Sequence, residues 1–431
     1  MQTRHCDLRR KGEGWMVADP EPDLDAVSTA VADLRAGGLV IVVDDADREN
    51  EADLVVAASD VRPDQIAFMI RHTTGILCVP MPGALLDRPG MEMMVGDNTD
   101  PHQTAFTVSV DHRGVSTGVS ASDRCATANA LADPDATAEL FTRPGHMFPL
   151  RAREGGVLKR AGHTEAAVDL LTQANKYPVA VISELINDDG TMLRGEQISD
   201  FATAHGLAVV TVADLVRYRR RHDKLVERSG IATLPTTHGE FQAVAYRDTI
   251  NGFEHLALTM GDPTDSPPDG LLVRVHSECL TGDLFGSHRC DCGTQLTDSL
   301  ELISAERHGV LIYLRGQEGR GIGLGNKLQS YALQEQGYDT LDANLALGLP
   351  VDSREFGIGA QILSDLGVQR MRLITNNPAK YRDLDGYGIE VTGRYSLPTT
   401  LTAHNVKYLR AKRDRLGHEI TISLPTDVVN T

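Results

Sequence analysis

Three cysteines stand close together in the second half of the chain. They follow the pattern Cys279-x10-Cys290-x-Cys292. Thiolates are soft ligands that suit Zn²⁺, and a set of three leaves one position open for water, as in catalytic zinc sites. A closed structural site completed by His276 or His288 is the alternative that the spacing leaves open.

Glycine-rich and polar stretches occupy later positions in the same half. The segment YLRGQEGRGIGLGNK (313–327) contains Arg315, Glu318 and Arg320 among its glycines, a composition that favours phosphate binding. Further donors stand in VDSREFGIGAQIL (351–363) and ITNNPAK (374–380). Each segment alone is consistent with a plain turn or helix cap. Together they indicate a site for phosphate and a nucleobase.

An acidic segment in the first half offers a different chemistry. The sequence DDADRENEADL (44–54) follows the apolar run LVIVV (39–43). Loops at strand ends are where α/β folds place their sites, and crowded carboxylates raise one another's pKa or bind a hard cation such as Mg²⁺. A solvated acidic loop is the alternative, and this segment alone favours neither.

Two histidines and a carboxylate at the end of a strand add to this set. Gly162-His163-Thr164 stands where a helix is expected to begin, so its free N–H groups suit a phosphate. His163 could join a carboxylate on a metal ion, although His146 or His163 taken singly is more often structural. Glu184 ends the apolar strand of VISELINDDGTM (181–192), where a carboxylate is either paired structurally or catalytic.

Interleaved helices and strands must carry these segments. Apolar spacing and capping signals predict helices at 24–34, from 63 through 70, and at 120–131, 164–174, 197–205, 212–226, 295–307, 325–336, 356–366 and 403–415. Strands are predicted at 39–43, 104–110, 179–183, 207–211, 270–276, 309–314 and 371–375. This order predicts the α/β class (mixed α+β), with two mixed-sheet catalytic domains in tandem.

The predicted organisation has four parts. Residues 1–20 form an N-terminal extension, 21–224 the first domain, 225–238 a linker and 239–431 the second domain. The linker follows from a Thr-, Pro- and Gly-rich stretch with little apolar periodicity. The basic run RYRRRHDK (217–224) before it is interpreted as a solvated helix end rather than a nucleic-acid patch.

Composition excludes several classes of protein. The 431 residues carry a formal charge of −18, and this field repels nucleic acids and anionic membranes while leaving room for a small phosphorylated substrate. No apolar run is long enough for a bilayer, and the first residues lack a secretory apolar core. Six cysteines are too few for a disulfide scaffold. A cytoplasmic enzyme without nucleic-acid or membrane partners is expected.

Four segments of the first half resemble, in order, the signature blocks of dihydroxybutanone phosphate synthase, the riboflavin-pathway enzyme that acts on ribulose 5-phosphate. They are DDADRENEADL, NTDPHQTAFTVSVD with STGVSASDR, RPGHMFPLRAREGGVLKRAGHTEAAVDL, and SELINDDGTM. The resemblance implies Mg²⁺ or Mn²⁺ on Glu49 and His163, and His146 and Glu184 as catalytic groups. It implies these ribulose 5-phosphate contacts: Arg48, Glu49, Asp53, Arg160, Ala161, Gly162, His163, Thr164 and Glu184.

The second half resembles GTP cyclohydrolase II through RVHSECLTGDLFGSHRCDCGTQL and the three later segments above. The resemblance implies Zn²⁺ on the three cysteines, with Mg²⁺ accompanying GTP. It implies that Asp352 accepts a proton, that Arg354 meets the α-phosphate and that Tyr331 lies near the guanine. It implies these GTP contacts: Arg274, Val275, His276, Ser277, Glu278, Gln295, Glu318, Gly319, Arg320, Thr340, Thr375 and Lys380.

Both resemblances together imply a fused bifunctional enzyme of riboflavin biosynthesis, and a homodimer for its first half. Arg354 is better understood as an electrostatic clamp than as a nucleophile, because a guanidinium holds its proton. A few positions depart from the family patterns: Thr74, Gln103, Ser183, Gly325, Ser353, Glu355 and the compact loop 111–118. Gln103 and that loop motivate one alternative, in which only the cyclohydrolase half is active. A protein that senses GTP without turnover is the other.

Overall fold

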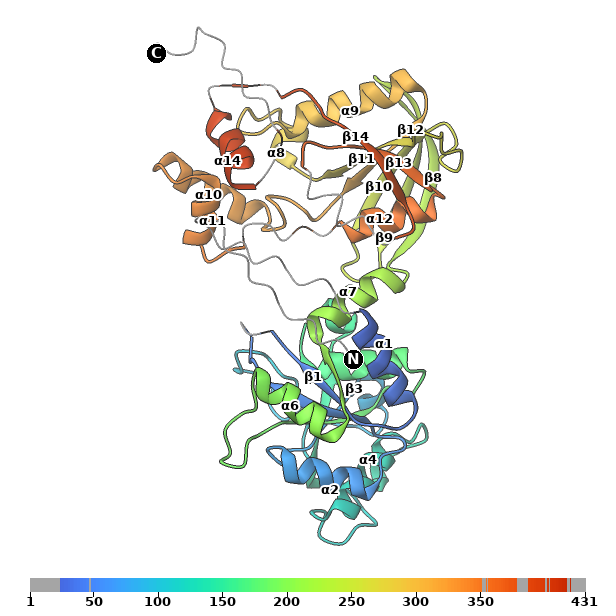
Figure 1. The fold of residues 1–431 in the computed structure, drawn as a ribbon, viewed down its shortest axis with the longest axis vertical. Coiled ribbons are helices and arrows are strands. Elements are labelled where there is room, and N and C mark those ends of the chain that lie inside the picture. Colours follow the sequence, from blue (N-terminus) through green and yellow to red (C-terminus); the bar gives the residue numbers. More distant parts are fainter. Residues whose placement is uncertain are drawn as a thin grey trace. The chain divides into compact units, whose positions relative to one another are not determined.

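Two seven-stranded mixed sheets carry the fold (Figure 1). The computed structural model describes residues 24–45, 48–350, 354, 356–377, 387–399, 401–402, 404–416 and 419. The chain divides into two compact units, Met1–Tyr218 and Arg219–Thr431, with one sheet in each. The predicted α/β class with two mixed sheets in tandem is confirmed. The proposed extension 1–20 lies outside the described residues.

The first unit contains a sheet with the strand order β4-β5-β3-β6-β2-β1-β7. Its strands are β1 (Val40–Val43), β2 (Ala52–Ala57), β3 (Cys78–Pro82), β4 (Val110–His112), β5 (Phe141–Ala152), β6 (Ala180–Glu184) and β7 (Ala208–Thr211). Only the pairs β1–β7 and β3–β5 are parallel. The interior strand β2 is buried along its whole length, so the sheet must be covered on both faces.

Helices cover both faces of this sheet. One apolar cluster joins it to α1 (Leu24–Arg35), α5 (His163–Gln173) and α7 (Val212–His222). The other joins it to α2 (Pro63–His72), α4 (Ala121–Leu131) and α6 (Glu196–His205). The short helix α3 (Gly83–Asp87) and two 3₁₀ turns, Ala138–Leu140 and Gly156–Leu158, complete the unit.

The second unit has the strand order β14-β13-β11-β12-β10-β9-β8. Its strands are β8 (Val226–Thr236), β9 (Gly239–Asp248), β10 (Glu254–Met260), β11 (Leu271–Ser277), β12 (Gly309–Leu314), β13 (Arg370–Ile374) and β14 (Glu390–Tyr395). Strands β12, β11, β13 and β14 are mutually parallel. Their carboxyl ends therefore meet at one edge, where open α/β sheets bind ligands.

Helices α9 (Cys292–Glu306) and α12 (Gly357–Asp365) pack on opposite faces of the second sheet. The short helix α8 (Leu280–Asp283) precedes α9. Three more helices, α10 (Leu324–Glu335), α11 (Thr340–Ala346) and α14 (Val406–Leu416), gather to one side of the sheet in Figure 1, and α11 contacts both of the others.

The structure corrects three of the sequence predictions. The predicted linker 225–238 contains the whole of β8, the edge strand of the second sheet. The helix predicted to reach 226 ends at His222, where the Gln361 side chain donates to the carbonyl oxygens of Arg220 and Asp223, each at 2.8 Å. In the predicted strand 104–110, only Val110 belongs to a strand, β4.

Among the described residues, every helix is too short or too polar to cross a membrane.

Candidate active sites

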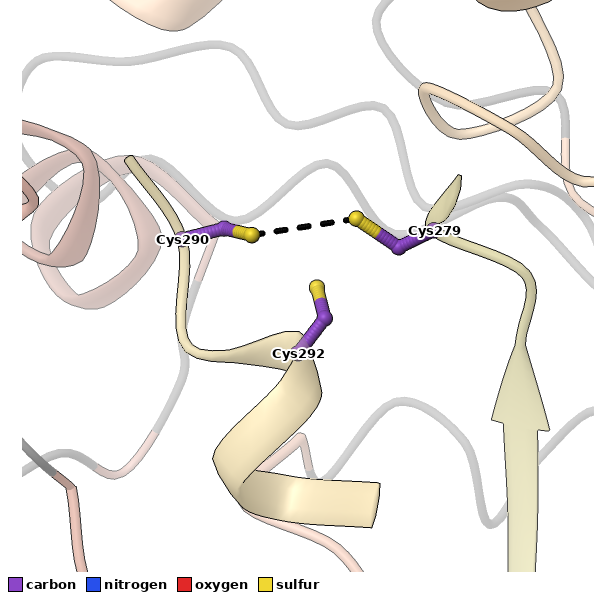
Figure 2. Close-up of side chains that lie close together, drawn as sticks. All are labelled: Cys279, Cys290 and Cys292. Carbon is purple, nitrogen blue, oxygen red and sulfur yellow. Dashed lines mark hydrogen bonds between the residues drawn. The ribbon is translucent and has the colours of Figure 1, made fainter. Parts of the chain in front are cut away.

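The three clustered cysteines converge on one point (Figure 2). Cys279 follows β11, and Cys290 and Cys292 come from the turn that begins α9. The Sγ atoms of Cys279 and Cys290 lie 3.7 Å apart, and all three sulfurs lie within 4.8 Å of one another. Four ligands arranged tetrahedrally about Zn²⁺, at Zn–S distances of ~2.3 Å, place sulfurs about 3.8 Å apart. The cluster therefore fits a zinc ion.

Local chemistry favours the thiolate form of the first cysteine. Hydrogen bonds with Cys290 and Cys292 and the charge of Lys327 outweigh burial and hold the pKa of Cys279 well below its usual range. Cys292 occupies the first position of α9, where the helix dipole favours negative charge.

Two buried lysines flank the cysteines. The Nζ atom of Lys327 in α10 lies 3.2 Å from the Sγ atom of Cys279. The Nζ atom of Lys412 in α14 donates to Asp291, between the other two cysteines, at 2.7 Å. Both ammonium groups therefore place positive charge beside the thiols.

A pocket opens in front of these cysteines at the carboxyl edge of the parallel strands. It holds about 1070 Å³ of space including its mouth, which is large enough for a nucleotide-sized ligand. Its walls come from β11, from the segments that follow β11, β12 and β13, and from α9, α10, α11 and α14. It contains the three cysteines, the predicted catalytic residues Tyr331 and Arg354, and most of the predicted GTP contacts: Arg274, His276, Ser277, Glu278, Gln295, Gly319, Arg320, Thr340 and Thr375.

Four predicted residues stand apart from this lining. Val275 is buried in the apolar core between the sheet and α12. Glu318 lies behind the pocket wall, where its Oε1 atom accepts a hydrogen bond from Lys327 at 2.5 Å. Asp352 and Lys380 lie outside the described residues.

A polar chain fixes the floor of the pocket. Arg274 donates to the Ile374 carbonyl at 3.0 Å and to Gln295 at 2.9 Å, and Gln295 donates to Asp291 at 2.7 Å. Asp291 also accepts from Lys412, so β11, β13, α9 and α14 are linked through side chains. Because these groups are buried and bonded to one another, the pocket is largely preformed.

In the first unit, Asp44, Glu49 and His163 form a second cluster suited to a metal ion. Their ligand atoms lie within 4.8 Å of one another. Asp44 also folds the loop: its carboxylate accepts from the Arg48 guanidinium at 2.9 Å and from the backbone N–H groups of Glu49 at 3.1 Å and Glu51 at 2.9 Å. The Nδ1 atom of His163 lies 3.5 Å from the Glu49 carboxylate.

The electrostatics of this cluster favour a cation. Burial opposes charge on His163, but the carboxylates of Asp53, Glu49 and Asp44 outweigh it and raise its pKa to about 9. The hydrogen bond from His163 lowers the pKa of Glu49 to about 2, whereas burial raises that of Asp53 to about 7. The Oδ1 atom of Asp53 and the Nε2 atom of His163 are buried without a hydrogen-bond partner. Oxygen and imidazole donors in such a field fit Mg²⁺ or Mn²⁺.

An anion cradle lies beside this cluster at the start of α5. Gly162 is the N-cap of the helix, and a Cβ atom there would come within 2.6 Å of the Arg160 guanidinium and 2.9 Å of that of Arg48. Two guanidinium groups thus converge on the first free N–H groups of a helix, as phosphate sites require. Arg160 is held by Glu165 at 2.7 Å and by the carbonyl of His102 at 3.1 Å.

Glu184 stands on the neighbouring strand. It is the direct cross-strand partner of Asp53 in the β2–β6 pair, so both carboxyl groups face the same side of the sheet. The Oε2 atom of Glu184 accepts a hydrogen bond from the Thr74 hydroxyl at 2.5 Å. Thr74, one of the departures from the family pattern, therefore retains the hydroxyl that orients this carboxylate.

His146 is not brought into this cluster. It lies on β5, which β3 separates from β6, a spacing of about 10 Å. Its Nδ1 atom lies 2.7 Å from Asp111, and 46% of its side chain is exposed.

Comparison with known proteins decides the family. Residues 28–218 match the 3,4-dihydroxy-2-butanone 4-phosphate synthase family, and residues 227–396 match the GTP cyclohydrolase II family. The riboflavin biosynthesis protein RibBA of Rhodococcus jostii (strain RHA1) is 56% identical over 401 residues, covering 92% of this chain and 96% of that protein. The chain belongs to the family of bifunctional riboflavin biosynthesis proteins.

One solved structure in particular supports this assignment. The crystal structure of RibBX, a two-domain 3,4-dihydroxy-2-butanone 4-phosphate synthase from A. baumannii, is 36% identical and covers 86% of this chain and 99% of its own, with a TM-score of 0.64. A 3,4-dihydroxy-2-butanone 4-phosphate synthase solved in complex with two magnesium ions is 42% identical and covers 46% of this chain and 98% of its own, with a TM-score of 0.45.

This protein is therefore an enzyme with a lyase and a hydrolase domain, the synthase unit and the cyclohydrolase unit, and acts on small molecules. Both resemblances inferred from the sequence are confirmed. The alternatives of one active half and of a GTP sensor gain no support, because both domains are present at high identity.

Sequence reasoning missed part of each site. In the synthase unit the acidic segment includes Asp44, but the sequence predicted no separate role for this residue. In the cyclohydrolase unit it missed several pocket residues: Arg289, Gln317, Ile322, Lys327, Ser330, Gln334, Asn344, Tyr408 and Lys412. The two lysines have no local signal for a place beside the cysteines, because Cys279 lies 48 positions from Lys327 and Asp291 lies 121 positions from Lys412 in the chain.

Proposed function

We propose that each unit uses its own residues for one of two independent reactions. The synthase unit converts D-ribulose 5-phosphate to L-3,4-dihydroxy-2-butanone 4-phosphate and formate. The cyclohydrolase unit converts GTP to 2,5-diamino-6-(ribosylamino)pyrimidinone 5′-phosphate, formate and pyrophosphate. The observation that carries this proposal is the presence, in each unit, of a metal-suited cluster with anion-binding groups beside it or in the same pocket.

In the cyclohydrolase unit, Cys279, Cys290 and Cys292 would hold zinc. When bound, zinc supplies a water of lowered pKa for attack on the imidazole carbon of guanine. Arg320 and Arg354 line the same pocket and neutralise the triphosphate, with Arg354 as the electrostatic clamp at the α-phosphate. Tyr331 has the Arg289 guanidinium 4.8 Å from its ring centre, which orients the aromatic face that meets the base. Asp352 and Lys380 complete the set as proton acceptor and phosphate contact.

In the synthase unit, Glu49 and His163 would hold Mg²⁺ or Mn²⁺, and Asp44 fixes the loop that carries Glu49. When bound, the ion supplies polarisation of the sugar carbonyl. The substrate phosphate lies at the start of α5, where Arg48, Arg160 and the N–H groups of Thr164 and its neighbours converge. Asp53 and Glu184 face the sugar and exchange protons with its carbons.

A homodimer would supply the remaining group. His146 is half exposed and about two strand spacings from Glu184, so a second copy has room to bring its own His146 to this cluster. Asp111 orients the ring for that role. We place this dimer in the cytoplasm, because the cysteine cluster works only as reduced thiols, and all three of its cysteines are free.

Formate release tests the proposal. Purified full-length protein receives ribulose 5-phosphate with Mg²⁺ in one reaction and GTP with Mg²⁺ and zinc-replete enzyme in another. We expect formate in both, with the two phosphorylated products. Formate from GTP alone would show that only the cyclohydrolase unit is active. Formate from neither would contradict both assignments.

A further inference from the structure

Lys327 lies buried in α10 against the cysteine cluster. Its Nζ atom donates to the Sγ atom of Cys279 at 3.2 Å, the Oγ1 atom of Thr281 at 2.8 Å and the Oε1 atom of Glu318 at 2.5 Å. An ammonium group has three donors, so all three are used. About nine-tenths of the side chain is removed from solvent, where an ammonium persists only when paired.

The surrounding chain is built to hold this lysine in place. Gly319 has φ of +61°, and a Cβ atom there would lie 3.1 Å from the Cβ atom of Lys327, so the glycine-rich loop passes close to its stem. Glu318, beside it, accepts from Lys327 through one oxygen and from the N–H of Leu280 through the other, at 2.6 Å. Lys327 therefore joins the glycine-rich loop to the turn that carries Cys279.

The positive charge of Lys327 affects how the cysteine cluster binds a metal ion. Three thiolates and a divalent ion leave a net charge of −1, which one ammonium group neutralises. A thiolate that accepts a hydrogen bond donates less electron density to its metal, because its lone pairs are held at lower energy. The ion then remains a stronger Lewis acid.

We propose that Lys327 is a positioning residue of the cysteine cluster, which holds the Cys279 sulfur toward Cys290 and Cys292 and weakens its electron donation to the metal. The inference rests on the proposed zinc-dependent function of the cyclohydrolase unit. It assigns a role to a residue outside the three ligands and outside the GTP contacts named above.

Lys327 also lines the pocket, so direct binding of the triphosphate is the competing explanation. The positioning role and the phosphate-binding role predict different effects of replacing Lys327. A phosphate contact affects GTP binding and leaves the metal unaltered, whereas a hydrogen bond to Cys279 changes the metal in the absence of any nucleotide. A measurement on the metal without GTP separates them, and it remains informative even if the enzyme were to turn over no GTP.

The experiment uses full-length protein loaded with Co²⁺ in place of zinc, without GTP. The near-ultraviolet sulfur-to-cobalt charge-transfer band is recorded for the parent chain and for Lys327→Met, Lys327→Gln and Lys327→Arg. Losing the ammonium raises the energy of the sulfur lone pairs, so the Met and Gln variants are expected to shift the band to longer wavelength. Arginine retains a cationic donor, so its shift is expected to be smaller.

Lys412→Met is the matched control. It removes a buried ammonium from the same pocket, but one that donates to the Asp291 carboxylate at 2.7 Å. Because its hydrogen bond goes to a carboxylate and not to a sulfur, its band is expected to move much less than that of Lys327→Met. Steady-state rates add a second readout: Lys327→Met should lower kcat for formate release about tenfold, with KM changed less than about threefold.

Three outcomes would overturn the inference. The first is an unmoved band in whichever neutral variant folds and retains the sulfur-to-cobalt band, the Gln variant serving if the Met variant does not fold. The second is an equal shift in Lys412→Met. The third is a raised KM with unchanged kcat and an unmoved band, which would make Lys327 a triphosphate contact.

Discussion

A methyl group on Gly282 would lie 2.8 Å from the Sγ atom of Cys290. The same Cβ position is 3.1 Å from the Sγ atom of Cys279 and 3.1 Å from the Cβ atom of Cys292. The absence of a side chain at Gly282 is therefore what allows three sulfurs to approach one point. Zinc tolerates ligand displacements of only about 0.2 Å.

Gly282→Ala is expected to weaken zinc binding at least about tenfold, because one sulfur must move out of reach of the ion. Zinc content after dialysis against a graded chelator measures this. Gly325→Ala is the control, since its Cβ would meet nothing within 4 Å in α10. Equal zinc retention in the two variants would contradict the expected crowding.

The same residues show what a sequence can reveal about a site. The cysteines stand within one short segment, so spacing alone identified them as a metal set. Lys327 and Lys412 could not be found in this way, because their roles exist only once α10 and α14 fold against that segment. His146 was assigned from resemblance, and its separation from Glu184 depends on a strand order that no local pattern encodes.

The fold was predictable where elements have one buried face. Residues 225–238 were misassigned because β8 is exposed at nearly every position, so its sequence needs no apolar alternation. Pro235 suggested a loop, but an edge strand tolerates proline because one of its sides makes no ladder hydrogen bonds. The end of α7 was missed because the group that caps it, Gln361, is distant in sequence.

Asp44→Asn is expected to raise the Mg²⁺ concentration for half-maximal synthase activity about tenfold without abolishing the activity. The asparagine amide retains one oxygen acceptor, but its NH₂ group replaces the other oxygen and faces a donor, either the Arg48 guanidinium or a backbone N–H group. The loop that carries Glu49 is then held less firmly. A Mg²⁺ titration of formate release from ribulose 5-phosphate measures this. An unchanged titration curve would show that Asp44 does not organise the loop.

Gln103 is expected to have little effect on the synthase reaction. Its φ of +52° is a left-handed conformation that glycine adopts more easily, and its Oε1 atom accepts from Arg153 at 3.0 Å. Gln103→Gly relieves about 1–2 kcal/mol of backbone strain. This gain offsets two losses: the hydrogen bond, and the larger conformational entropy of an unfolded chain that contains glycine. We expect stability within about 1 kcal/mol and formate release within about threefold.

Gln103→Ala is the matched control for this change. It retains the left-handed strain and loses the hydrogen bond, so it should be less stable than the parent by about 1 kcal/mol. A tenfold gain in synthase rate in the glycine variant would instead show that Gln103 suppresses the activity.

Asp365 makes the cyclohydrolase unit sensitive to acid. Its Oδ2 atom accepts from Arg228 of β8 at 2.6 Å and from the Tyr246 hydroxyl of β9 at 2.9 Å. Burial opposes its charge, but these bonds outweigh it and lower the pKa of Asp365 below its usual value. The stability that Asp365 contributes is therefore complete above that usual value, about 4, and is lost as pH falls through the lower folded pKa.

Asp365→Asn is expected to cost up to about 1 kcal/mol at pH 7, since the carboxylate is partly exposed, and progressively less below about pH 4. Denaturant unfolding followed by circular dichroism, resolved into the transitions of the two units, measures the difference. Asp60→Asn is the control: it removes a carboxylate that accepts a hydrogen bond from Lys176 in the synthase unit, so it should leave the unfolding transition of the cyclohydrolase unit unchanged. A difference that is constant from pH 3 to 7 would contradict the role of the charge.

The central claim is that two separate sites perform two reactions, and a pair of variants in the full-length protein tests it most directly. Formate release is measured from each substrate for Glu49→Gln and Cys290→Ser, with folding checked by circular dichroism. We predict that Glu49→Gln abolishes the ribulose 5-phosphate reaction and retains the GTP reaction, and that Cys290→Ser does the reverse. Loss of both reactions in either folded variant would contradict the two-site account.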